Sequence, residues 1–166
     1  MLNLNLKKIL INFLLFFLIF ALDRFSKIFI LNLSENSNYF SIHINEFLSF
    51  ILIWNSGIGF GLFSSENNFF YNLTTFLIGA INLFIIYLTI LSKNIKRKIF
   101  IIILGGSMGN LFDRVYYGAV PDFIDISFKG YHWFIFNVAD IFITIGIFCL
   151  IFIEIFDYKK TNEQNS

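Results

Sequence analysis

The 166-residue chain is poor in the residue types on which many soluble and metal-dependent folds rely. It holds one cysteine, one proline and two histidines, and 14% of its residues are charged, against about 25% in a typical soluble domain. The single Cys149 excludes an internal disulfide. No HExxH spacing or His/Cys cluster predicts a metal site, and no GxxxxGK[ST] loop predicts phosphate binding. An ordinary soluble domain and a zinc-dependent enzyme are therefore disfavoured.

What the chain does have is long apolar runs. Hydrophobic residues make up 57% and aromatic residues 20% of it, which also excludes intrinsic disorder. A helix needs about 20 residues to cross a hydrocarbon layer roughly 30 Å thick. Four runs reach that length, two of them only with their polar ends, at about 9–33, 69–91, 99–117 and 134–156. We expect an all-α polytopic membrane protein with four transmembrane helices, forming a single membrane-embedded domain over residues 1–156.

The basic residues predict how these helices are oriented. Eight of the twelve lie on one side of the predicted spans: Lys7, Lys8, Lys93, Lys96, Arg97, Lys98, Lys159 and Lys160. By the positive-inside rule this side is cytoplasmic, so both termini lie inside and the connections 34–68 and 118–133 lie outside. The stretch "ALDRFSK" lacks a small-x-small cleavage site, which favours a retained first span. Residues 157–166 are expected to form a polar, disordered cytoplasmic tail.

The first outward connection carries a pattern of its own. Hydrophobic and polar residues alternate from Phe40 to Asn45, and three glycines follow in "NSGIGFGLF". Alternation followed by glycine predicts a short β-element over residues 40–63, on the outer face of the membrane.

Polar residues gather at the predicted outer ends of the spans. Asp23 and Lys27 are spaced i,i+4, and Asn137 and Asp140 are spaced i,i+3, so each pair lies on one helix face. A third group, near the end of the third span, contains Asn110, Asp113 and Arg114. Charges inside a membrane are costly and indicate either ion pairs or a functional site.

Both interpretations apply here. We expect ion pairs between Asp23 and Lys27 and between Asp113 and Arg114. The whole region holds three cations, Arg24, Lys27 and Arg114, against five carboxylates, Asp23, Asp113, Asp122, Asp125 and Asp140. Two carboxylates are in excess, and two close carboxylates share a proton because they cannot both ionise cheaply. Such a pair can activate water and protonate a leaving group.

Other kinds of site fit less well. Ser26 and Lys27 are adjacent and do not face each other on a helix, and neither His43 nor His132 has a serine nucleophile motif nearby. A proton-coupled transporter would place ionisable residues near the midplane in repeated halves, whereas this chain shows no repeat. A structural membrane subunit is the third possibility, in which the clustering of polar groups would be coincidental.

Several motifs together resemble one family. They are "DRFSK" (23–27), "NSGIGFGLF" (55–63), "GGSMGNLFDRV" (105–115), "VPDFID" (120–125) and "FNVADIFITIG" (136–146). In this order, in a four-span chain of this length, they resemble the bacterial lipoprotein signal peptidases, or type II signal peptidases. Gly59 and Pro121 depart from the residues common in that family, but neither is a carboxylate.

The resemblance implies an aspartyl endopeptidase of the bacterial cytoplasmic membrane. Such an enzyme cuts the signal peptide from a prolipoprotein just before the cysteine that bears a diacylglyceryl group. The family pattern implies a catalytic pair, Asp122 and Asp140, and these supporting residues: Asp23, Lys27, Asn55, Gly57, Asn110, Asp113, Arg114 and Asn137. It also implies a small β-cradle and a loop on the outer face, matching residues 40–63. Partners would be prolipoproteins and membrane lipid, with no nucleic acid, metal or cofactor, and we expect a monomer.

Overall fold

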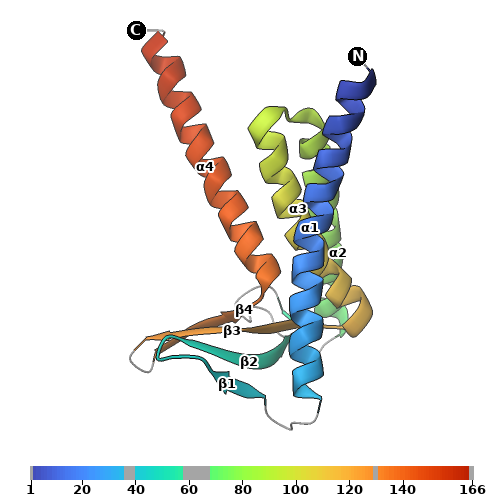
Figure 1. The fold of residues 1–166 in the computed structure, drawn as a ribbon, viewed down its shortest axis with the longest axis vertical. Helices are drawn as coiled ribbons and strands as arrows, with labels where there is room; N and C mark the ends of the chain where they lie inside the picture. Colours follow the sequence, from blue (N-terminus) through green and yellow to red (C-terminus); the bar gives the residue numbers. More distant parts are fainter. Residues whose placement is uncertain (1, 36–39, 58–67, 129–130, 165–166) are drawn as a thin grey trace.

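The protein forms four helices and one four-stranded sheet (Figure 1). The structure is a computed structural model that describes residues 2–35, 40–57, 68–128 and 131–164. The helices are α1 (Leu2–Ser34), α2 (Asn68–Leu91), α3 (Asn94–Tyr117) and α4 (Val138–Gln164). The strands are β1 (Ser41–His43), β2 (Leu48–Asn55), β3 (Val120–Phe128) and β4 (Tyr131–Phe136). Within the described ranges, four helices are long and apolar enough to cross a membrane. The expected fold class, a four-helix membrane protein with a small β-cradle, is confirmed.

Helix α3 is the centre of the helical part. It packs against α1, α2 and α4, whereas the described residues of α2 and α4 barely touch each other. Half of the apolar segment of α3 is buried, against 11% in each of the other three helices. Small residues allow this close packing, because Gly105 lies against Ile19 of α1 and Gly106 lies against Ala139 of α4. The outer surfaces of α1, α2 and α4 expose leucine, isoleucine and phenylalanine, as helices facing lipid do.

The sheet lies at one end of the helices (Figure 1). Its order is β1-β2-β3-β4 and all neighbours are antiparallel. Strands β1 and β2 fall within the β-element expected over 40–63, whereas residues 58–63 lie outside the described residues. A small core of Ile30, Phe40 and Phe123 joins the sheet to the end of α1.

Strands β3 and β4 were not predicted. The predicted fourth span begins at Phe134, but residues 134–136 belong to β4, which pairs with β3, and α4 begins at Val138. A short apolar run cannot be assigned to helix or strand from periodicity alone. Helix α3 ends at Tyr117, and β3 begins at Val120, just before Pro121. Gly118 adopts a left-handed conformation (φ 76°), and its N–H donates to the carbonyl of Arg114.

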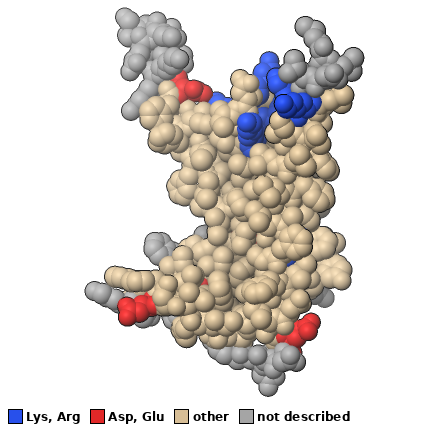
Figure 2. All heavy atoms as spheres, in the orientation of Figure 1, with Lys and Arg blue, Asp and Glu red and all other residues tan. Residues whose placement is uncertain are grey.

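The two ends of the molecule differ in charge. Figure 2 shows Lys and Arg side chains gathered at the end that holds the chain termini, away from the sheet. Here Lys96 of α3 forms ion pairs with Glu154 (2.8 Å) and Asp157 (2.9 Å) of α4. Helix α4 continues to Gln164, so the expectation of disorder from residue 157 is wrong for the described part of the tail. Residues 157–164 contain neither glycine nor proline to stop the helix.

The contact between α3 and α4 generates a stability prediction. A Cβ added at Gly106 would lie 2.7 Å from the carbonyl oxygen of Ala139, so Gly106→Ala must push the two helices apart. We expect a loss of about 1–3 kcal/mol in the free energy of unfolding, the usual cost of overpacking. The matched control is Gly79→Ala on α2, where an added Cβ meets nothing within 4 Å and the gain in helix propensity is up to about 1 kcal/mol. Thermal melting in detergent measures the difference. Equal melting temperatures for the two variants would contradict this packing.

Candidate active site

Four charged side chains form a buried network where α1 meets α3. Lys27 Nζ lies 2.9 Å from the Asp23 carboxylate and 2.6 Å from Asp113 Oδ2. Arg24 donates to Asp23 (3.0 Å) and to Asp113 (2.7 Å). The side chains of Asp23, Lys27 and Asp113 are fully buried and Arg24 is nearly so. Two cations therefore balance two carboxylates in a region that lipid surrounds, and we call these four residues the ion tetrad.

The ion tetrad also holds α4. The backbone N–H of Ala139, in the first turn of α4, donates to Asp23 Oδ1 at 3.0 Å. Gly109 of α3 leaves the space that the Asp23 carboxylate occupies, since a Cβ there would meet its Oδ2 atom. One carboxylate thus contacts α1, α3 and α4, and it fixes where α4 starts relative to the other two helices.

The expected Asp23–Lys27 pair is confirmed, but the expected Asp113–Arg114 pair is wrong. Neighbouring residues on a helix point in different directions, so Asp113 faces α1 while Arg114 faces α2. The Arg114 guanidinium lies 5.8 Å from the centre of the Tyr71 ring and donates to the Ser56 carbonyl at 3.4 Å. Tyr71 donates its hydroxyl to the Arg114 carbonyl. Arg114 therefore ties α2, α3 and the end of β2 together.

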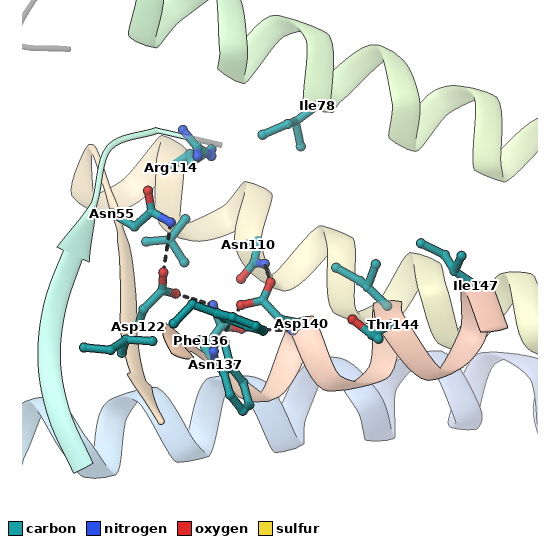
Figure 3. A pocket seen from close by; sticks show the side chains of 14 residues that line it. Asn55, Ile78, Asn110, Arg114, Asp122, Phe136, Asn137, Asp140, Thr144 and Ile147 are labelled. Atoms are coloured by element: carbon teal, nitrogen blue, oxygen red, sulfur yellow. Dashed lines mark hydrogen bonds between the residues drawn. The ribbon is translucent and has the colours of Figure 1, made fainter. Parts of the chain in front are cut away.

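Asp122 of β3 and Asp140 of α4 face the same cavity, and Asn137 lies between them (Figure 3). The four carboxylate oxygens of this pair each accept one hydrogen bond. Asp122 Oδ1 accepts from Asn137 Nδ2 (2.6 Å) and Oδ2 from Asn55 Nδ2 (2.9 Å). Asp140 Oδ1 accepts from Asn110 Nδ2 (2.9 Å) and Oδ2 from the Asn137 backbone N–H (3.0 Å). Every one of these donors is neutral.

The i,i+3 spacing of Asn137 and Asp140 forms the cap of α4. Asn137 precedes the helix, and its Oδ1 accepts the backbone N–H of Asp140 at 3.2 Å. Asp140 in turn accepts the backbone N–H of Asn137. This reciprocal arrangement satisfies two N–H groups that a helix start leaves unpaired. The same two residues therefore begin the helix and position the Asp140 carboxylate.

Hydrogen bonds to their side-chain oxygens fix the orientations of three asparagine amides. In each, an N–H donor holds the carbonyl oxygen, so that the NH2 group must point at an aspartate. The pairs are Lys27 Nζ to Asn110 Oδ1 (2.8 Å), the Gly57 N–H to Asn55 Oδ1 (2.9 Å) and the Asp140 N–H to Asn137 Oδ1 (3.2 Å). Lys27 of the ion tetrad donates to Asn110, and Asn110 donates to Asp140, so one asparagine connects the tetrad to that carboxylate.

The surroundings of Asp122 favour its protonated form. Burial, and next the negative charge of Asp140, raise the pKa of Asp122 from an ordinary value of 3.8 to about 6. Hydrogen bonds from Asn137 and Asn55 oppose the shift without cancelling it. An aspartate with a pKa near neutrality can both accept and release a proton under physiological conditions.

The cavity that these groups face has a volume of 360 Å³. One end is polar. The rest is walled, apart from Thr144, by apolar side chains of α2, β4 and α4, among them Ile78, Phe134, Phe136, Ile143 and Ile147 (Figure 3). Ile147 lies seven residues beyond Asp140 on α4, so the apolar part extends about 10 Å along the helix. Among the residues that the structure describes, no group of three His, Cys, Asp or Glu side chains is placed to hold a metal ion.

The structure brings all ten predicted site residues into one region. Six line the cavity: Asn55, Asn110, Arg114, Asp122, Asn137 and Asp140. The other four support them from behind: Asp23, Lys27 and Asp113 within the ion tetrad, and Gly57 against Asn55. Asp125, counted among the carboxylates of the region, does not line the cavity.

Arg24, Tyr71 and the apolar wall of the cavity were not among the predicted site residues. Arg24 lies within the "DRFSK" motif and could have been included on that ground. Tyr71 and Ile147 carry no signal in a single sequence, because aromatic and branched residues are common along every span.

Comparisons with known proteins agree on one family. Residues 15–156 match the family described as "Signal peptidase (SPase) II". A lipoprotein signal peptidase of Pelagibacter ubique is 51% identical over 98% of this chain and 99% of its own length. Another, from Anaplasma phagocytophilum, is 35% identical over 96% of this chain and 99% of its own. Among solved structures, a bacterial membrane enzyme determined by the in meso method at 2.3 Å superposes with a TM-score of 0.73 at 25% identity, covering 90% of both chains.

The ion tetrad generates a prediction about stability. Lys27→Met leaves the carboxylates of Asp23 and Asp113 buried with one cation instead of two, so we expect a loss of about 3–5 kcal/mol in the free energy of unfolding. Lys96→Met is the matched control, because it breaks two ion pairs of similar length whose side chains are exposed. Thermal melting in detergent should separate the two variants clearly. Equal melting temperatures would show that burial of the tetrad does not matter.

The raised pKa of Asp122 predicts how stability depends on pH. Between the unfolded value near 3.8 and the folded value of about 6, the folded carboxyl binds a proton that the unfolded chain has lost. The free energy of unfolding should therefore fall as pH rises through this window and level off above it. The contribution from Asp122 is about 2 kcal/mol between about pH 4.5 and about pH 7. The free energy of unfolding of the parent, measured relative to that of Asp122→Asn, should fall by this amount as pH rises across the range. An equal pH dependence of the two proteins would contradict the shift.

Proposed function

Since the chain belongs to the signal peptidase II family, we propose that Asp122 and Asp140 are its catalytic pair. The chain is an aspartic-type peptidase that removes signal peptides from prolipoproteins. One observation carries the assignment of the pair. These two carboxylates face one cavity and accept hydrogen bonds from neutral donors, whereas Asp23 and Asp113 are neutralised by cations.

In the proposed mechanism the pair holds one proton and activates a water molecule between the two carboxyl groups. The ionised carboxylate removes a proton from the water as its oxygen attacks the carbonyl carbon of the scissile peptide bond. The protonated carboxyl then donates its proton to the departing nitrogen, and the C–N bond breaks. The signal peptide leaves with a new carboxylate, and the lipoprotein keeps a free amine. The raised pKa of Asp122 supports its carrying the shared proton at the start of the cycle.

The asparagines serve this mechanism by positioning the carboxylates without neutralising them. A cation in their place would hold both aspartates ionised and remove the acid from the pair. Asn137 contacts both carboxylates, so it sets their relative orientation. Asn110 connects Asp140 to Lys27 and so orients Asp140 against the ion tetrad. We propose that these residues, together with Asn55, are positioning residues.

The cavity supports a substrate that is itself held in the membrane. We propose that the apolar end of the signal peptide lies along α4 past Ile143 and Ile147, with its scissile bond at the polar end of the cavity. The described residues of α2 and α4 make little contact, so the substrate can enter between them from the lipid. A cysteine that carries a diacylglyceryl group would keep its acyl chains in the bilayer at this opening. We therefore propose cleavage just before such a lipidated cysteine.

The chain is a multi-pass protein of the bacterial inner membrane. We propose that both termini are cytoplasmic, because the Lys and Arg side chains gather at that end, and that the catalytic pair and the sheet lie at the outer face (Figure 2). A monomer is sufficient, since one chain supplies all six predicted site residues that line the cavity. The membrane-embedded domain over residues 1–156 is proposed to hold the entire activity.

The catalytic assignment predicts a sharp effect of single substitutions. Asp122→Asn and Asp140→Asn should each lower cleavage of a diacylglyceryl-modified precursor at least a thousandfold, since each removes one half of the acid–base pair. Asp125→Asn is the control within the same strand, because Asp125 is buried but does not line the cavity; it should retain cleavage in proportion to its folded fraction. The measurement is precursor cleavage by purified protein in detergent, normalised by thermal melting. If either cavity variant cleaves at the parent rate, the pair is wrongly assigned.

A further inference from the structure

A second cavity lies at the opposite end of the molecule from the aspartates, where α1 meets the link between α2 and α3. Its volume is 640 Å³. It is lined by Lys8, Ile11, Asn12, Lys93, Asn94, Ile95, Arg97 and Lys98. Figure 2 shows that Lys and Arg side chains gather at this end. Nothing in the peptidase mechanism uses these residues.

The charge around this cavity is strongly positive. Four of its eight lining residues are cations, and the lining includes no carboxylate. Within the described residues, Lys8, Lys93 and Lys98 form no ion pair. The nearby carboxylates of Glu154 and Asp157 are engaged by Lys96, which does not line the cavity.

Among the described residues of this cavity, Arg97, unlike the three lysines, hydrogen-bonds to the backbone at the end of α2. Its Nε donates to the Ser92 carbonyl at 2.8 Å, and Nη2 lies 3.4 Å from the Ile90 carbonyl. It therefore holds the end of α2 against the start of α3 and builds the wall of the cavity. The lysine ammonium groups are exposed and can reach a ligand.

The depth and the apolar part of the cavity point to a membrane ligand. Lys8 directly precedes the apolar run that begins at Ile9, so the cavity lies where α1 passes from the interface into the hydrocarbon. Ile11 and Ile95 contribute exposed apolar surface beside the lysines. Basic pockets between helix ends at this level suit anionic lipid headgroups.

We propose that this cavity binds the headgroup of an anionic phospholipid. The phosphate would lie among Lys8, Lys93 and Lys98, with the glycerol and the first methylene groups against Ile11 and Ile95. A zwitterionic headgroup fits less well, because its cationic end would face the lysines. The bound lipid would bridge α1 to the link between α2 and α3. This proposal is independent of the assignment of the catalytic pair.

Native mass spectrometry of the full chain in detergent tests the site. Phosphatidylglycerol and phosphatidylcholine are titrated separately, and the dissociation constant of the first bound lipid is measured. We expect Lys8→Gln and Lys98→Gln each to weaken phosphatidylglycerol binding about fivefold, and the double variant about twentyfold. Lys7→Gln is the matched control, since Lys7 is the exposed neighbour of Lys8 on α1 and does not line the cavity. It should bind phosphatidylglycerol as the parent does.

Each other outcome overturns the proposal. If Lys7→Gln weakens binding as much as Lys8→Gln, the attraction is the diffuse charge of this end and no site is formed. If phosphatidylcholine binds the parent as tightly as phosphatidylglycerol, the lysines do not select an anion. If inorganic phosphate displaces phosphatidylglycerol at equal concentration, the ligand is a free anion and the lipid chains add nothing. Loss of precursor cleavage is not part of the test, so failure here leaves the catalytic assignment untouched.

Discussion

The structure depends on the burial of two cations and two carboxylates where α1 meets α3. Removing four charges from water costs more than almost any other step in the fold, so the charges must meet at short distance with their hydrogen bonds satisfied. Lys27, Asp23, Asp113 and Arg24 meet at short distance, although Arg24 Nε has no hydrogen-bond partner among the described residues. Asp23 Oδ1 also accepts a hydrogen bond from the first turn of α4. The helices therefore have one favourable mutual position, and that position places Asn110 beside Asp140.

Two sets of aspartates lie in one region of the structure and differ in what they contact. Asp23 and Asp113 contact cations, so their charge is balanced and serves packing. Asp122 and Asp140 contact amide and backbone N–H groups, which fix their direction and leave their charge unbalanced. All four side chains are aspartates, so the partners that they contact decide which pair is structural and which pair can react. Lys27 connects the two sets. Its ammonium group binds the carboxylates of Asp23 and Asp113, and it also orients the Asn110 amide, which donates to Asp140.

Local rules account for the features that the sequence predicted well. Apolar runs gave the four helices, i,i+4 spacing gave the Asp23–Lys27 pair, and i,i+3 spacing placed Asn137 beside Asp140. The clearest failure involves partners that are far apart in the chain. Asp113 pairs with Arg24, 89 residues away, rather than with the neighbouring Arg114. Strand β4 was missed for another reason: its apolar run, which pairs with the nearby β3, does not by itself distinguish a strand from the start of a helix. The orientation of the Asn110 amide depends on Lys27, 83 residues away in the chain, which only the folded arrangement brings beside it.

The proposed entry of the substrate between α2 and α4 has a kinetic consequence. The cavity is lined by residues of both helices, whose described residues make little contact, so a substrate that enters there need not leave the bilayer. Encounter then becomes a collision between two solutes that diffuse in a plane. The quantity that sets the rate of encounter is the number of precursors per unit area of membrane, and a dilution of the surrounding medium would leave it unchanged.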